Sequence, residues 1–138
     1  MVLPPTLEMV LRLLLAAALG AAIGYQRERA KKPAGLRTHI LIALGCALFT
    51  VVSVFGFEDT ADVARVAAGV VTGIGFIGAG VIFRGLRGSN EHVVGLTTAA
   101  SIWVTAAIGL AAGVGLYLVA VVVTILTVVT LMIPRVQG

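Results

Sequence analysis

Charged residues are scarce in this sequence. Of the 138 residues, 12% are charged and 59% are hydrophobic, and the mean hydropathy is +1.11. A soluble domain of this size carries about 25% charged residues. The chain therefore lacks the polar side chains that would cover a globule in water, and we expect an integral membrane protein. Its length fits one domain over residues 1–138.

Cysteine is almost absent, and the residue patterns that carry chemistry are missing. The one cysteine, Cys46, lies within an apolar run, so an intramolecular disulfide is excluded. The sequence has no Cys/His pattern of a metal site, no nucleophile placed beside a base and no phosphate-binding lysine motif. We therefore expect no enzymatic activity and no bound cofactor.

Apolar residues dominate what is present, and they gather in five segments of roughly the 20 residues that cross a bilayer. The segments span about 5–25, 38–57, 62–83, 96–112 and 114–133. Only "GVG" separates the last two, which predicts a tight helical hairpin. We predict an all-α, multi-pass membrane bundle of about five helices.

Basic residues outnumber acidic ones by ten to six, and their placement predicts the orientation. The first connector, "QRERAKKPAGLR", holds five of them, the third connector holds Arg84 and Arg87, and the tail holds Arg135. Five spans place these eight residues on one side, where cytoplasmic loops collect Lys and Arg. We predict an external N-terminus and a cytoplasmic C-terminus, with the lipid bilayer and no nucleic acid as partner.

The stretch "GIGFIGAG", residues 73–80, matches the glycine spacing of a dinucleotide-binding loop. That loop must follow a strand and open a helix, but here the preceding "RVAAGVVT" continues the same apolar run. On a helix, Gly69, Gly73 and Gly80 share one face, and Gly75 and Gly78 lie on roughly the opposite one. We predict a central helix pressed between two neighbours. The alternative is a partly unwound segment that lines a cavity.

Hydroxyl side chains form a stripe at the start of the fourth segment. Thr97, Ser101 and Thr105 follow at four-residue steps, Thr98 lies beside them, and Trp103 faces away. These hydroxyls either have a structural role, in which they bond the carbonyls four residues earlier or join helices, or they line a path for a small solute or hydrated ion. The predicted middle of every span lacks Asp, Glu, Lys and Arg, which argues against an active pump.

Two further patterns concern packing near the ends of the chain. Small residues recur at four-residue steps in the first segment and as Gly109 and Gly113 in the fourth, which predicts close helix contacts. Glu8 and Arg12 are four residues apart, so we expect them to pair near the outer interface.

Four stretches together resemble the MgtC/SapB family of bacterial membrane proteins. They read "GAAIGYQRER", "PAGLRTHILIALG", "RVAAGVVTGIGFIGAGVIFR" and "GLTTAASIWVTAAIGLAAGVGLY", and cover most of residues 20–117. The resemblance implies an inner-membrane protein with a hydrophobic domain of about five helices. It also implies a link to magnesium limitation and, in some pathogens, to virulence. Longer members carry a soluble C-terminal domain, which we expect this chain to lack.

Positions that match the family pattern are candidate functional or packing residues, and the hydroxyl stripe adds two more. The set is Arg27, Glu28, Arg37, Thr38, Arg65, Gly73, Gly75, Gly78, Gly80, Thr97, Thr98, Ser101, Trp103 and Thr105. Gln26 stands where the pattern has Glu, and Gly69 stands where it has Gln. These departures put in doubt an ionic role for that pair of positions.

The resemblance implies a regulator of other membrane complexes, the ATP synthase among them, in magnesium homeostasis and stress adaptation. Magnesium would then be a ligand or a signal. The alternative is a transporter or channel that carries Mg²⁺ or another small solute through a path lined by the glycines and threonines. We also expect a homo-oligomer, because five short helices leave small-residue faces to cover.

Overall fold

The computed structural model describes residues 3–57, 62–86 and 95–134, and its secondary structure over them is helical. The five helices are α1 (Pro5–Arg29), α2 (Leu36–Phe55), α3 (Val63–Leu86), α4 (Leu96–Val114) and α5 (Tyr117–Leu131). Each predicted segment is one helix, so the all-α expectation is confirmed.

Four of the helices, α1 to α4, are long and apolar enough to cross a membrane. α5 has 15 residues, which is about 22 Å at 1.5 Å per residue. The hydrocarbon core is about 30 Å thick. A fifth crossing by α5 and the predicted orientation therefore stay predictions.

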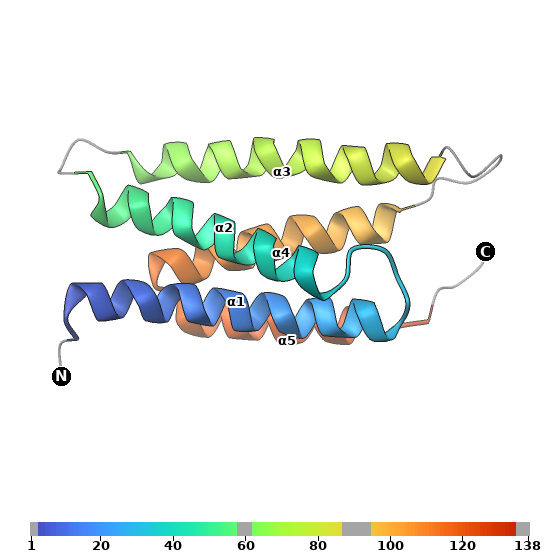
Figure 1. Cartoon of the computed structure of the whole chain (residues 1–138), viewed down its shortest axis with the longest axis horizontal. Coiled ribbons are helices and arrows are strands. Elements are labelled where there is room, and N and C mark those ends of the chain that lie inside the picture. The colour runs from blue at the N-terminus through green and yellow to red at the C-terminus, as the bar shows by residue number, and fades with distance from the viewer. Residues whose placement is uncertain (1–2, 58–61, 87–94, 135–138) are drawn as a thin grey trace.

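The helices form three layers (Figure 1). α3 lies along one side, α2 and α4 cross in the middle, and α1 lies beside α5 on the other side. α4 contacts all four other helices, and it has the largest buried share of the four long ones. The central helix is thus α4.

Close approach of backbones holds α1 and α4 against α2. A Cβ added to Gly20 of α1 would lie 2.6 Å from the carbonyl oxygen of His39, and one on Gly113 of α4 would lie 2.7 Å from the Cβ of Thr50. Gly24 and Gly109 meet α2 just as closely. The predicted small-residue contacts in the first and fourth segments are confirmed, and they press α1 and α4 against α2.

The two predictions for α3 are wrong. In the described part of the chain α3 contacts only α2 and α4, so it lies at the edge of the bundle. Its helix runs without interruption from Val63 to Leu86, so residues 73–80 are not unwound. Neighbouring glycines lower helix propensity, but here they do not break the helix.

The "GVG" turn has the expected form. Gly115 adopts a left-handed φ of 92°, its N–H donates to the carbonyl of Ala112 at 3.1 Å, and the N–H of Leu116 donates to that of Ala111 at 2.9 Å. This pair of bonds is a Schellman motif, which ends a helix and satisfies two of its last carbonyls. The predicted hairpin between α4 and α5 is confirmed.

Candidate functional site

Arg27 belongs to a buried cluster of polar residues, which we call the polar cluster and which also contains His39, Thr98 and Ser101. The sequence placed Arg27 in a basic connector, but α1 continues to Arg29 and buries Arg27 in its last turn, with 4% of its surface exposed. Its Nη2 donates to the Thr98 hydroxyl and to the carbonyl of Pro33, the latter at 3.4 Å. Arg27 therefore joins the end of α1 to the first turn of α4.

His39 joins the first turn of α2 to the same part of α4. Its side chain is fully buried; Nδ1 lies 2.9 Å from the carbonyl oxygen of Gly35, and Nε2 lies 3.0 Å from the Ser101 hydroxyl. A carbonyl can only accept, so Nδ1 carries a proton. The Ser101 hydroxyl also lies 2.7 Å from the Thr98 carbonyl, so its single proton serves one of two acceptors at a time.

The hydroxyl stripe of α4 faces the interior and makes internal hydrogen bonds. Thr98, Ser101 and Thr105 are buried, and the Thr105 hydroxyl donates to the Ser101 carbonyl at 2.6 Å. Thr97 is exposed, and Trp103 is 59% exposed on the other side, as predicted. The structural interpretation is confirmed in parts: Ser101 and Thr105 bond carbonyls of their own helix, and Thr98 and Ser101 join α4 to α1 and α2.

The glycines of α3 are mostly uncovered. A Cβ on Gly69, Gly73, Gly75 or Gly80 would meet none of the described residues within 4 Å, whereas one on Gly78 would lie 3.6 Å from the Cβ of Ala99. We call Gly69, Gly73 and Gly80, which share one side of the helix, and the surface around them the open face of α3. The stripe faces α1 and α2, where Thr98 and Ser101 bond Arg27 and His39 and not these glycines. A path lined by the glycines and threonines therefore stays a prediction.

Two apolar grooves flank α3. A groove of about 490 Å³ lies between α2 and α3, where Gly69 and Gly73 line it together with Cys46. A second groove, of about 380 Å³, lies between α3 and α4, where Gly75 and Gly78 face Trp103. The division of the glycines between two faces is as the sequence predicted, but each face borders a groove and not a tightly packed helix.

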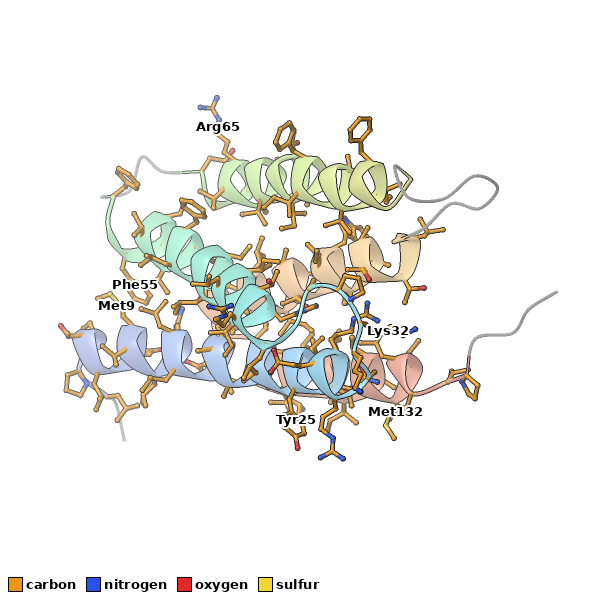
Figure 2. All side chains as sticks on the ribbon, turned by 45° about the vertical axis from the view of Figure 1, so that its right-hand side comes forward. Met9, Tyr25, Lys32, Phe55, Arg65 and Met132 are labelled. Atoms are coloured by element: carbon orange, nitrogen blue, oxygen red, sulfur yellow. The ribbon has the colours of Figure 1, made fainter. Side chains whose placement is uncertain are left out.

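The remaining candidates lie at the surface. Glu28, Arg37 and Arg65 are exposed, and Thr38 is half-buried. Figure 2 shows Arg65 pointing away from the bundle on the outer side of α3. The structure does not bring these residues together with the polar cluster into one site, and their roles stay predictions.

A second arginine, Arg12, makes contacts that the sequence did not predict. The expected pair with Glu8 forms at 2.5 Å, but Arg12 is also buried, with 8% of its surface exposed. It donates to the carbonyl of Gly113 at 2.9 Å and to the Tyr117 hydroxyl at 3.2 Å, and its guanidinium lies 4.9 Å from the ring centre of Phe55. The sequence offered one signal for this contact, which is the aromatic hydroxyl of Tyr117 two residues after the "GVG" turn.

Within the described ranges, His, Cys, Asp and Glu side chains form no group of three that would hold a metal ion. The polar cluster itself contains a guanidinium, which repels cations. The residues that the structure describes therefore offer hydroxyls and carbonyls to a hydrated ion, but no dedicated Mg²⁺ cage.

Comparison with known proteins places the chain in a family. The model of the MgtC family matches residues 13–137. YhiD of Escherichia coli K12, named as a candidate magnesium transporter, is 49% identical over 133 residues, which are 91% of this chain and 60% of YhiD. MgtC of Salmonella typhimurium LT2 is 44% identical over 117 residues, which are 85% of this chain and 48% of that protein.

SapB of Bacillus subtilis is 42% identical over 117 residues, which are 80% of this chain and 49% of SapB. The chain thus spans about half to 60% of the length of these relatives. No solved structure matches it. With a family model over nearly its whole length and the helices in the expected order, the chain belongs to the MgtC family.

Proposed function

We propose that this protein is a non-enzymatic regulator in the bacterial inner membrane, which acts in magnesium homeostasis by helix–helix contact with another membrane protein. The observation that carries this proposal is the open face of α3. A Cβ on any of its three glycines, Gly69, Gly73 and Gly80, would meet none of the described residues within 4 Å, although the glycines of α1 and α4 touch α2.

The open face is suited to a transmembrane helix of a partner. Each glycine lowers helix stability by about 1 kcal/mol relative to alanine, and Gly69, Gly73, Gly75 and Gly80 gain no contact in return within the described residues. In lipid, helices associate by close packing at small residues, because lipid tails are as apolar as side chains. Glycines that make no close contact among the described residues of the chain therefore allow the backbone of a helix from another protein to approach closely.

The connection to magnesium comes from the relatives. YhiD is named for magnesium transport. The chain covers 60% of YhiD, so we propose for this chain a role in the same ion's homeostasis and leave transport as the competing function.

Affinity purification from native membranes tests the regulator proposal. Gly73→Leu fills the open face, and Ala18→Leu makes the same kind of change on an exposed position of α1, which does not contact α3 in the described residues. We expect a membrane protein to co-purify with the wild type and with Ala18→Leu and to be lost with Gly73→Leu. Recovery of the same partner with Gly73→Leu, or of no partner at all, would contradict the proposal.

The same preparation tests the expected homo-oligomer. Two differently tagged copies co-purify if a second copy covers the open face, and Gly73→Leu then abolishes that association. If only copies of this chain are recovered, the open face serves self-assembly and the regulator proposal fails.

Transport is the competing function, and the name of YhiD favours it. Uptake of Mg²⁺ into proteoliposomes of the purified protein decides between the two. Transport requires flux above empty vesicles and a change in that flux with Thr98→Val, which removes a buried hydroxyl. Flux equal to that of empty vesicles excludes Mg²⁺ transport by this chain alone.

A further inference from the structure

The two buried arginines lie at opposite ends of α4, and their electrostatic surroundings differ. Arg12 binds the Gly113 carbonyl in the last turn of α4 and pairs with Glu8. Arg27 binds the hydroxyl of Thr98 in the first turn of α4. A helix carries partial negative charge at its C-terminus and partial positive charge at its N-terminus. The end of α4 therefore stabilises Arg12, and its beginning repels Arg27.

Arg27 also lacks a counter-ion among the residues that the structure describes. Their only side-chain ion pair is Glu8–Arg12. Glu28, the neighbouring carboxylate, is exposed, and its Oε1 lies beside Gly35. The Nε of Arg27 is buried and makes no hydrogen bond. A buried guanidinium with neutral partners and an unused donor is unfavourable unless an anion joins it.

The N-terminus of α2 lies beside the first turns of α4 that contact Arg27. α2 starts at Leu36, and His39 in its first turn is bonded to Ser101 of α4. The N-cap residues of α2 and α4 are Gly35 and Gly95, and within the described residues neither helix has a side-chain cap. The first N–H groups of a helix without a cap are the usual setting of an anion site.

Exposed cations surround this end of the bundle. Arg29, Lys31, Lys32 and Arg37 are all exposed, and Figure 2 shows Lys32 on the connector between α1 and α2. They would raise the local concentration of anions at the entrance. Because Arg27 lies in the last turn of α1, an anion reaches it from the aqueous end of the bundle and not through lipid.

We propose that the junction of α1, α2 and α4 binds a phosphate oxyanion, held by the guanidinium of Arg27 and the first turns of α2 and α4. Phosphate offers several oxygens at once, so it accepts from the unused Nε, from Nη2 and from backbone N–H groups. Inorganic phosphate and the headgroup of an anionic phospholipid share this chemistry. The site does not involve α3, so it stands independently of the regulator proposal.

Thermal unfolding of the whole protein in neutral detergent tests the site. Inorganic phosphate should raise the unfolding temperature progressively, relative to chloride at the same ionic strength, because a ligand of the folded state stabilises it. Arg27→Lys keeps the charge but lacks the planar fork, so we expect roughly tenfold weaker phosphate binding. Arg65→Gln removes an exposed charge on α3, away from the site, and should leave the phosphate effect largely intact.

A lipid source is distinguished by native mass spectrometry after transfer to nanodiscs. A headgroup site retains phosphatidylglycerol on the wild type, releases it from Arg27→Lys and prefers it over phosphatidylcholine. A site for the free ion shows the phosphate effect in detergent and no retained lipid. Either result supports the oxyanion site and identifies its source.

The proposal is overturned if phosphate and phosphatidylglycerol both have no effect on the wild type, or if Arg27→Lys responds like the wild type. Glu91 lies in the connector 87–94, outside the described residues. If Glu91→Gln lowers the unfolding temperature as much as Arg27→Gln does, and neither phosphate nor phosphatidylglycerol has an effect on the wild type, the counter-ion is internal and the oxyanion site is excluded.

Discussion

Single residues decide how tightly the helices of this protein approach one another. Glycines on α1 and α4 meet the backbone of α2, whereas most glycines on α3 meet nothing. The same residue type therefore has two opposite roles in one chain. The two roles can be separated by adding one methyl group, in a glycine-to-alanine substitution on each kind of helix.

Gly109→Ala should destabilise the protein and Gly73→Ala should not. A Cβ on Gly109 would overlap the Ala43 carbonyl, and forcing a methyl group into a packed contact costs about 1–3 kcal/mol. A Cβ on Gly73 meets no atom within 4 Å, and alanine raises helix propensity by up to about 1 kcal/mol. Thermal unfolding in detergent measures both changes. A larger loss for Gly73→Ala than for Gly109→Ala would show that another chain already covers α3 in the sample.

Arg12 stabilises the turn between α4 and α5. The Schellman motif satisfies the carbonyls of Ala111 and Ala112, and Arg12 satisfies that of Gly113. Arg12→Met should therefore lower the free energy of unfolding by about 1–3 kcal/mol, because a buried carbonyl loses its donor. The control is Arg29→Met, at an exposed position of the same helix. Equal losses in the two variants would assign the effect to general charge and not to this contact.

At the scale of elements, the four long helices fall into two groups. Of the 18-residue stretch that qualifies each helix as a membrane span, 56% is buried in α4 and 11% is buried in α3. Both grooves border α3. An element with few buried contacts opens locally at low free energy, while one in the core opens only with the whole fold.

Hydrogen exchange should therefore separate α3 from α4. In detergent micelles we expect the amides of α3 to exchange much faster than those of α4, and α1 and α2 to resemble α4. Exchange is followed by mass spectrometry of peptides from each helix. Equal protection of α3 and α4 would mean that a copy or a partner covers α3 under those conditions. The exchange of Gly73→Leu, measured in the same way, would then show whether α3 loses that protection.

At the scale of the whole molecule, the helices alternate so that α1, α3 and α5 end on the same side (Figure 1). The connector after α1 carries Arg29, Lys31 and Lys32 at that side. Basic residues are retained in the cytoplasm during insertion. The geometry is therefore compatible with the predicted external N-terminus, and the orientation itself calls for a direct test.

Cysteine labelling in intact cells provides it. In a Cys46→Ser background, a single cysteine at Leu3 should react with a membrane-impermeant maleimide without lysis, once the outer membrane is removed. Single cysteines at Lys32 and Ile133 should react only after lysis. The opposite pattern would reverse the topology, and labelling of Ile133→Cys and Leu3→Cys from the same side would show that α5 does not cross.

The sequence alone determined the number and order of the helices, their membrane character and the family. Long apolar runs bounded by charged connectors leave little choice, because backbone groups in lipid must be bonded within the segment. It also predicted the Glu8–Arg12 pair and the hairpin at "GVG", because both depend on neighbours along the chain. The direction of Trp103 followed from the helical period.

Only the tertiary structure decided which helix is central and where the arginines lie. Periodicity identifies the faces of a helix but not the segment that covers each face. The glycines of α3 therefore predicted close neighbours for α3, whereas the close contacts form at the glycines of α1 and α4. Arg27 read as part of a basic connector, yet one more helical turn buries it against Thr98, a residue 71 positions away. Such a contact depends on how three helices cross, and that crossing is set by steric fit between side chains distant in the sequence.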